Sequence, residues 1–409
     1  MAGIASKSRF HLEVRLESAM RLLQVSTVAA ALEAFLVPFA RHFRKIGWEV
    51  HCAAADVTQS EICAAEFDGS HDVPWSRNPL AFKNLLAGRR VRAIVDNYGF
   101  DIVHVHTPVA SFVTRAALRR TRGRPAVVYT AHGFHFFEDD NSLPQLAYKV
   151  LERVAGPWTD QLVVINSEDE RSATKFGLVP QHKLRHVPGI GMDSDAFRKA
   201  AVEAKDRATY RRELGIATNE RVILMVAEFT PNKRHVDVID AVAAVQAAGV
   251  EVRLVLAGVG PTMETVVQRA TSTGIADRVR FLGFRRDVPG LMKMADVLVL
   301  ASDREGLPRS IMEAMAAGLP AIGTKIRGVE DLLVDGAGVL IPPRDSRSLA
   351  QALIRLLDSP AERHAMVDVA RRRVERFSIA QVLEAYEEVY SRALFSVDEP
   401  PPPGAPRRS

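Results

Sequence analysis

The chain has 409 residues, of which 47% are hydrophobic and 25% charged, and its formal net charge is +5. This length is about two to three times that of a typical domain, and the composition excludes a chain that is disordered throughout. No stretch approaches the roughly 18 consecutive apolar residues of a membrane-spanning helix. The two cysteines, Cys52 and Cys63, are too few for a disulfide scaffold, and their small number fits a reducing, cytoplasmic compartment.

The first half of the chain alternates short apolar strands with longer amphipathic helices. Residues 1–19 lack the apolar core of a secretory signal, so we expect a flexible N-terminal extension before the first strand, which follows Met20. The predicted strands are "RLLQVST", "WEVHCAA", "DIVHVHT", "AVVYTA", "QLVVINS" and "LRHVPG". The helices predicted between them include "LEAFLVPFARHFRKIG" and "LAFKNLLAGRRVRAIVDNYG". This alternation is typical of a parallel sheet covered by helices on both faces.

The second half repeats the pattern after a charged stretch, residues 193–216, in which no strand is predicted. Its predicted strands are "RVILMVAEF", "VRLVLAG", "RVRFLGF", "DVLVLAS", "PAIGT" and "GVLIPP". The sequence therefore predicts an α/β protein with two doubly wound domains, residues 20–200 and 201–378, that bind ligands at the carboxyl ends of their strands. The Pro-rich residues 398–409 are expected to form a disordered tail.

A basic block lies between Arg77 and Arg124. It holds ten Lys/Arg and two Asp, a local excess of eight positive charges. Such a block attracts anionic surfaces, phosphates or acidic lipid headgroups, although a solvated basic face is the alternative. We expect no nucleic-acid partner, because no recognised fold signature and no interleaved aromatic residues accompany the charge.

The segment "EGLPRSIMEAMAAG" (305–318) follows a predicted strand and opens a helix. Pro308 suits the first helical turn, where its missing N–H costs nothing. The positive end of the helix dipole, together with nearby free N–H groups, forms a site for a phosphate. These N–H groups belong to Leu307, Arg309 and Ser310. Glu305 in the loop and Glu313 in the helix are about 12 Å apart by helical rise, which suits two parts of one extended ligand. Alternatively, Glu313 only pairs with the arginine four residues before it.

Glu305 and Glu313, with seven residues between them, resemble the signature of the retaining glycosyltransferases of family 4, which have the GT-B fold. The resemblance covers essentially residues 20–396 and includes the closing strand and turn "GVEDLLVDGAGVLIPPRD". It implies two Rossmann-like domains that face each other across a cleft, with a C-terminal helix (379–397) returning to the first. It also implies that Glu305, beside Gly306, binds the hydroxyls of the donor sugar and that Glu313 binds the ribose of the nucleotide.

The segment "YTAHGFHFF" (129–137) resembles the branch of this family that acts in capsule, exopolysaccharide and lipid-linked glycan assembly. The resemblance implies that His132 is an active-site histidine that contacts the donor sugar; alternatively it is a structural histidine at a strand end. His104 and His106 share one strand face, but no third ligand follows at useful spacing, so we expect no metal site. The resemblance likewise implies no cofactor, because the nucleotide sugar is a substrate.

The segment "VAEFTPNKRH" (226–235) is similar to the family's diphosphate-binding loop, in which an arginine is followed five residues later by a lysine. Lys233 matches the lysine, whereas Glu228 stands at the position of the arginine. The candidates for the second phosphate cation are Arg234 and Arg309. The segment "GFRRDVP" occupies the place where the family reads the nucleotide base, and its candidates for donor binding are Phe284 and Arg285.

The resemblance implies a retaining, metal-independent transferase that moves a sugar, expected from a UDP-sugar, in cell-surface polysaccharide biosynthesis. The acceptor is expected to be a glycan or a polyprenyl-diphosphate-linked molecule, which the basic block would approach on the anionic inner face of the membrane. The loop 26–35 lacks the family's glycine pair, and the acceptor-side candidates are Thr27 and His106. One alternative is a non-catalytic nucleotide-sugar-binding subunit of a polysaccharide assembly complex, favoured by Glu228. Another is a sugar-nucleotide epimerase, which the signature carboxylates disfavour.

Overall fold

The structure, a computed structural model, describes residues 19–76, 78, 81–121, 123–136 and 143–395. The predicted extension, except its last residue, and the predicted tail lie outside these ranges, as do Arg77 and Arg122 of the basic block. The chain divides into two compact units. The first unit takes its residues from 1–164, 170–187 and 383–409, and the second from 165–169 and 188–382.

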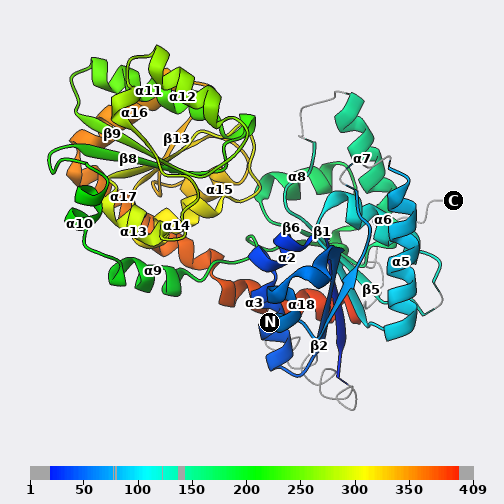
Figure 1. Ribbon diagram of the computed structural model, residues 1–409. Coiled ribbons are helices and arrows are strands. Elements are labelled where there is room, and N and C mark those ends of the chain that lie inside the picture. The colour runs from blue at the N-terminus through cyan, green and yellow to red at the C-terminus, as the bar shows by residue number, and fades with distance from the viewer. Residues whose placement is uncertain (1–18, 77, 79–80, 122, 137–142, 396–409) are drawn as a thin grey trace, which may run out of the picture. The chain divides into compact units, whose positions relative to one another are not determined.

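The first unit is built on a seven-stranded sheet in the order β3-β2-β1-β4-β5-β6-β7 (Figure 1). Every pair of neighbouring strands is parallel. The strands are β1 (Arg21–Val28), β2 (Glu49–Ala55), β3 (Gly69–Asp72), β4 (Ile102–Val105), β5 (Ala126–Ala131), β6 (Gln161–Val164) and β7 (Leu184–His186). The strand order reverses between β1 and β4, so this is the switch point at which doubly wound sheets bind ligands.

One helix predicted in the first unit is divided into two in the structure. They are α2 (Ala29–Phe35), α3 (Val37–Lys45), α4 (Glu61–Glu66), α5 (Lys83–Tyr98), α6 (Pro108–Leu118), α7 (Leu143–Ala155), α8 (Ser167–Lys175) and α18 (Ile379–Leu394). The single helix predicted over "LEAFLVPFARHFRKIG" is wrong: α2 and α3 are separate helices that meet at Leu36. Pro38 causes the break, because it has no N–H to continue the hydrogen bonds of α2 but fits the first turn of a new helix.

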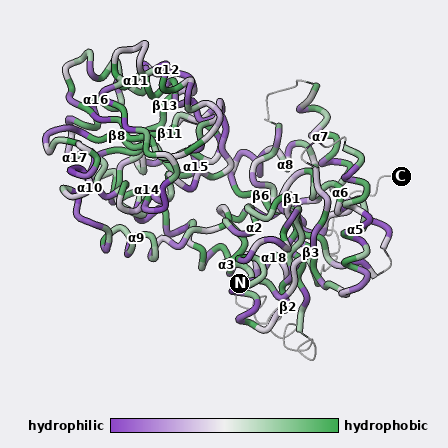
Figure 2. Tube along the Cα trace, viewed as in Figure 1, coloured by the Kyte–Doolittle hydropathy of each residue, from purple (hydrophilic) through white to green (hydrophobic). Residues whose placement is uncertain are grey.

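The second unit repeats the architecture with six parallel strands in the order β10-β9-β8-β11-β12-β13. They are β8 (Arg221–Val226), β9 (Val252–Ala257), β10 (Val279–Phe281), β11 (Val297–Leu300), β12 (Ala321–Thr324) and β13 (Val339–Ile341). Figure 2 shows the central strands β8 and β11 in the green of hydrophobic residues, as expected for strands buried on both faces. The order reverses between β8 and β11. The predicted class of two doubly wound parallel sheets is confirmed.

The helices of the second unit connect these strands. They are α9 (Ser194–Glu203), α10 (Arg207–Glu213), α11 (His235–Ala247), α12 (Met263–Ser272), α13 (Val288–Met294), α14 (Arg309–Ala317), α15 (Val329–Leu333), α16 (Ser346–Asp358) and α17 (Pro360–Val374). The charged stretch 193–216 contains α9 and α10 and no strand, as predicted. The largest buried hydrophobic cluster of this unit joins its strands to α11, α14 and α16.

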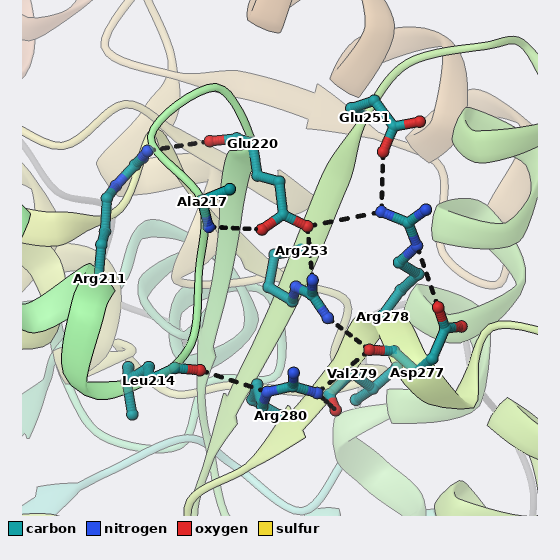
Figure 3. Close-up of polar contacts among 10 residues, drawn as sticks. All are labelled: Arg211, Leu214, Ala217, Glu220, Glu251, Arg253, Asp277, Arg278, Val279 and Arg280. Carbon is teal, nitrogen blue, oxygen red and sulfur yellow. Dashed lines mark hydrogen bonds and ion pairs between the residues drawn. The ribbon is translucent and has the colours of Figure 1, made fainter.

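A network of ion pairs and hydrogen bonds lies at the amino-terminal ends of strands β8, β9 and β10 (Figure 3). Glu220, just before β8, accepts a hydrogen bond from Arg253 Nη2 at 2.6 Å and another from the Ala217 N–H at 2.8 Å. Arg278, just before β10, bonds Glu251 at 2.8 Å. Because ligands bind at the opposite, carboxyl edge of such sheets, we assign this network to stability.

Candidate active site

Lys233 and Glu305 meet at the carboxyl edge of the second sheet. Lys233 follows β8 at the end of a short 3-10 turn, and Glu305 lies in the loop between β11 and α14. Their side chains form an ion pair, and Glu305 Oε1 also accepts a hydrogen bond from Ser302 Oγ at 2.5 Å. Strands β8 and β11 are the two at the switch point, so two of the predicted catalytic residues lie where this fold binds ligands.

Three polar residues that the sequence did not single out hold the Glu305 loop. Thr324 Oγ1 donates to the Ser302 carbonyl at 2.6 Å, and Asn232 Nδ2 donates to the Arg304 carbonyl at 2.9 Å. Arg327, a buried side chain, donates to the Glu305 carbonyl at 3.4 Å. These bonds are made to backbone oxygens, which leave no trace in a residue pattern. Asn232, beside Lys233, and Thr324, at the end of a predicted strand, lay within quoted segments, but neither had a predicted role.

The start of α14 differs from the prediction in one detail. Pro308 is the N-cap residue, with extended backbone angles of φ −73° and ψ 118°, and not a residue of the first helical turn. Its ring fixes φ but its ψ is not helical, so the helix begins at Arg309. No side chain caps this end, and the first N–H groups of an α-helix, here including that of Ser310, have no acceptor within the helix. These donors and the helix dipole make this end favourable for an anion.

Glu313 lies one turn into α14, where it is mostly buried. Its Oε1 accepts a hydrogen bond from Arg309 Nε at 2.8 Å, the contact that the structural alternative predicted. Burial raises the pKa of the Glu313 carboxyl, and Arg309 opposes this rise. Because the protein shields the Glu313 carboxylate from water, this group can accept hydrogen bonds from hydroxyl groups with little rearrangement of solvent.

The two candidates for a second phosphate cation are both engaged with carboxylates. Arg309 pairs with Glu313, and Arg234 forms two hydrogen bonds with Asp237 at 2.9 and 2.8 Å. Glu228 is exposed after β8 and forms no ion pair among the described residues. Lys233 is likewise paired with a carboxylate, that of Glu305, so each of the three predicted phosphate cations contacts an acidic side chain.

The predicted base-reading segment follows β10. Phe284 has 69% of its surface exposed, so its ring is available to stack on a planar ligand. Arg285 is held by Asp287 through bonds of 2.7 and 2.5 Å, and this carboxylate raises the pKa of the guanidinium. Leu307 packs against the core of the second unit, which anchors the loop that follows Gly306.

The predicted residues of the first unit lie at the carboxyl edge of its own sheet. Thr27 is near the end of β1, where its Oγ1 is 2.5 Å from Thr107 Oγ1. His106 follows β4 and His132 follows β5, and their rings meet through His106 Nδ1 and His132 Nε2 at 3.2 Å. Burial lowers the pKa of His132 to about 4, so this imidazole is neutral at neutral pH.

The first unit therefore holds Thr27, His106 and His132, and the second holds the remaining predicted site residues. Among the described residues, no group of three or more His, Cys, Asp or Glu side chains is placed to hold a metal ion. No helix in the described ranges is long and apolar enough to cross a bilayer.

Comparison with known proteins identifies the fold and then the family. Anabaena Alr3699/HepE, solved in complex with UDP and glucose, matches with a TM-score of 0.74 at 21% identity, over 91% of this chain and 99% of that one. WaaG, a glycosyltransferase involved in lipopolysaccharide biosynthesis, matches with a TM-score of 0.70 at 19% identity, over 92% and 100% of the two chains. The chain thus has the GT-B glycosyltransferase fold, as predicted.

Residues 32–190 match the model of Glycosyltransferase Family 4, and residues 206–373 match that of Glycosyl transferases group 1. EpsD of Bacillus subtilis (strain 168), whose name assigns it provisionally to the glycosyltransferases, is 34% identical over 373 residues, 91% of this chain and 96% of EpsD. The Escherichia coli UDP-Gal:alpha-D-GlcNAc-diphosphoundecaprenol alpha-1,3-galactosyltransferase is 30% identical over 295 residues, 71% of this chain and 75% of that protein. The chain belongs to glycosyltransferase family 4 and is an enzyme that transfers a sugar from a nucleotide-sugar donor.

Proposed function

We propose that this enzyme transfers a sugar, with retention of configuration, from a UDP-sugar to a glycan or polyprenyl-diphosphate-linked acceptor in cell-surface polysaccharide biosynthesis. The observation that carries the proposal is the Lys233–Glu305 ion pair at the carboxyl ends of β8 and β11, close in sequence to the start of α14. Two comparisons support the choice of substrates. HepE was solved with UDP and glucose, and the Escherichia coli relative is named for a UDP-galactose donor and a diphosphoundecaprenol acceptor.

In the proposed reaction the bond between the sugar's anomeric carbon and the diphosphate oxygen breaks, and a bond to the acceptor oxygen forms on the same face. The acceptor hydroxyl gives its proton to the departing diphosphate oxygen. Lys233 and the backbone N–H groups of Leu307, Arg309 and Ser310 stabilise the negative charge that develops on the diphosphate. Glu305 orients the sugar hydroxyls and Glu313 binds the ribose. His132 contacts the reacting sugar.

The first experiment measures nucleotide release from a panel of UDP-, GDP- and ADP-sugars, without and with membrane extract as acceptor. Glu305→Ala and Lys233→Ala are each expected to lower kcat by about 10²- to 10³-fold, because each removes a charge that acts on the reacting groups. The matched control is the exposed ion pair Lys199–Glu203, whose side chains are 75% and 65% exposed. Lys199→Ala and Glu203→Ala should leave turnover unchanged.

The outcomes separate the candidate functions. Release of one nucleotide that both site variants abolish would establish the transferase chemistry and identify the donor. Tight nucleotide-sugar binding without turnover would instead support the non-catalytic subunit, the role favoured by the exposed Glu228. Conversion of the donor sugar with no requirement for an acceptor, and without nucleotide release, would support an epimerase.

An exposed apolar stripe on the first unit supports the proposal of a lipid-linked acceptor. Helix α7 is partly reversed relative to a core-facing amphipathic helix: Lys149 and Glu152 are buried, whereas most of its large apolar side chains are exposed. The apolar residues that are more than a third exposed are Leu143, Leu146, Val150, Leu151 and Val154. They recur at three- and four-residue intervals, so they form one stripe. Such a stripe is typical of a helix that lies in a membrane interface.

The basic block contributes to this surface only in part. Arg115 is buried and pairs with Glu152 at 2.7 Å, and Arg124 bonds Asp160 at 2.7 and 2.8 Å. These two arginines are structural, which corrects the prediction for them. Arg89 and Arg90 of α5 are exposed, in the same helix as the exposed Leu85. Figure 1 shows α5, α6 and α7 along one side of the first unit. We propose that this side docks on anionic lipid.

The docking proposal predicts that the protein sediments with vesicles containing phosphatidylglycerol but weakly with neutral vesicles. Each charge near such a surface contributes about 1 kcal/mol, so the double change Arg89→Glu and Arg90→Glu should reduce binding by more than tenfold. Leu146→Asp should reduce it through the apolar stripe. Lys199→Glu, in the second unit, is the control. Unchanged sedimentation of both first-unit variants would contradict the proposal.

A further inference from the structure

One face of the first sheet carries a row of buried polar side chains that the transfer reaction alone does not explain. Gln24 of β1 is in register with His104 of β4, and successive residues of a strand alternate between faces. His106 therefore lies on the same face as His104, two residues further on. Thr130 and His132 continue this face on β5 and just beyond it, because Val128 is in register with His104. All but His132 are buried.

Helix α18 packs a tyrosine hydroxyl, that of Tyr390, against this row of polar side chains. Tyr390 OH lies 2.7 Å from His104 Nδ1 and 3.2 Å from Gln24 Nε2. Gln24 Oε1 lies 2.6 Å from His106 Nε2, and His106 Nδ1 lies 3.2 Å from His132 Nε2. A continuous chain of hydrogen bonds therefore runs from the tyrosine of α18 to the histidine at the edge of the sheet. None of these side chains leaves a buried polar atom without a partner.

The amide of Gln24 gives this chain a direction. An amide oxygen only accepts hydrogen bonds, so His106 must carry its proton on Nε2 to donate to Gln24 Oε1. His106 is neutral, because burial keeps its pKa well below the usual range, and its Nδ1 is then a lone pair. His132 must in turn carry its proton on Nε2 to donate to that lone pair. The Nδ1 of neutral His132 is left as an acceptor.

Tyr390 fixes the orientation of the amide from the other side. Its hydroxyl accepts from Gln24 Nε2 and donates to His104 Nδ1, since a buried hydroxyl proton needs an acceptor. His104 then carries its proton on Nε2 and donates to Thr130 Oγ1 at 2.8 Å. A reversed amide would reverse every bond in the chain, so the tautomer of His132 reports the state of the whole row.

We propose that Tyr390, Gln24 and His106 are positioning residues that hold His132 in its Nε2–H tautomer, so that Nδ1 accepts a hydrogen bond from a sugar hydroxyl. This inference rests on the proposed contact between His132 and the sugar. It specifies a hydroxyl donor as the group that His132 recognises, and it rules out a carbonyl or phosphate oxygen at that position. Among the described residues, His132 has no hydrogen bond other than that to His106.

The test is nuclear magnetic resonance of the full-length protein labelled with 15N in its histidines. Long-range 15N–1H correlations distinguish a protonated ring nitrogen from one with a lone pair, and the signal lost in His132→Gln assigns His132 among the 12 histidines. The proposal predicts a protonated Nε2 and a lone pair on Nδ1 near neutral pH. A protonated Nδ1 in the wild type would overturn it, whatever the variants do.

The variants test the positioning role. His106→Asn keeps an acceptor near the place of Nδ1 and should preserve the Nε2–H tautomer of His132. His106→Leu and Gln24→Met remove the hydrogen bonds that select this tautomer, so His132 should become a mixture of its two neutral tautomers. Donor turnover should fall about tenfold in kcat in the last two, the effect of one lost hydrogen bond, with KM little changed. Val103→Ala, a core change on the opposite face of β4, is the control for packing.

The two proposals fail in different ways. If the wild type releases no nucleotide from any donor, the proposed function is wrong, and the spectra still decide the tautomer. If His106→Leu and Gln24→Met both leave the His132 tautomer as it is in the wild type, the positioning role is wrong even in an active transferase. Loss of turnover in Val103→Ala equal to that in His106→Leu would also reject it, because packing alone would explain the effect.

Discussion

Gly328 lies against the loop that carries Glu305. Its φ is +73°, and a Cβ there would meet the carbonyl oxygen of Gly306 and come within 3.2 Å of the Leu307 nitrogen. The backbone cannot yield without moving the loop. Gly328→Ala is therefore expected to lower donor turnover at least about tenfold while the protein stays folded, since small misplacements of site groups are costly. Steady-state nucleotide release and circular dichroism measure the two effects.

Gly336 provides the matched control for this residue. It has a similar φ of +83°, but nothing lies within 4 Å of its added Cβ. Gly336→Ala therefore carries the same backbone penalty, roughly 1 kcal/mol, without the contact with the Glu305 loop. Equal losses of turnover in both variants would show that backbone strain, and not the close approach to Gly306, limits activity.

At the scale of single residues, the sequence predicted the charged residues of the site but not the residues that hold them in place through hydrogen bonds. Glu305 and Lys233 belong to motifs with fixed spacing, and their contact requires only that β8 and β11 be neighbours. Arg327 acts through the Glu305 carbonyl, a contact set by the path of the chain after β12. The pairing of Arg234 with Asp237 likewise depends on the left-handed backbone of Arg234, with φ 53°, which a residue pattern does not reveal.

At the scale of elements, the ends of β8, β9 and β10 are held together by the network around Glu220 (Figure 3). Glu220 and Arg253 are both buried, so removal of the carboxylate leaves a buried guanidinium unpaired. Glu220→Ala is expected to lower the free energy of unfolding by about 3 kcal/mol. Glu220→Gln keeps acceptor oxygen for the Ala217 N–H or Arg253 and should cost less. Urea denaturation measures both, and a loss below 1 kcal/mol in Glu220→Ala would contradict the assignment.

The strands were predictable because buried parallel strands read as continuous Val, Ile and Leu runs. Strand β3 was missed, because "GSHD" has neither an apolar run nor an alternating pattern, and it forms only by pairing with β2. The partly reversed helix α7 was missed for the opposite reason. Its apolar period is visible in the sequence, but the burial of Lys149 and Glu152 depends on partners elsewhere, such as Arg115.

At the scale of the whole molecule, both units contain buried or half-buried histidines that stay neutral at neutral pH. Burial lowers the pKa of His71, His132 and His235 to about 4, against an ordinary value of 6.5. The unfolded chain therefore binds more protons than the folded chain between pH 6.5 and pH 4. The free energy of unfolding has its full value above pH 6.5. It falls as the pH drops through this window, by roughly 1.4 kcal/mol per pH unit for each such histidine.

His235 allows this sign to be tested at one position. Its ring stacks on Phe229 with centroids 4.2 Å apart, and its buried Nδ1 has no hydrogen-bond partner. His235→Phe keeps the stacking and removes the proton, so the fall in unfolding free energy between pH 6.5 and pH 4.5 should become shallower by nearly one proton. His364→Gln, at an exposed histidine of the same unit, is the control for the loss of one histidine. An unchanged slope in His235→Phe would mean that this imidazole is already charged in the folded protein, which its dry environment opposes.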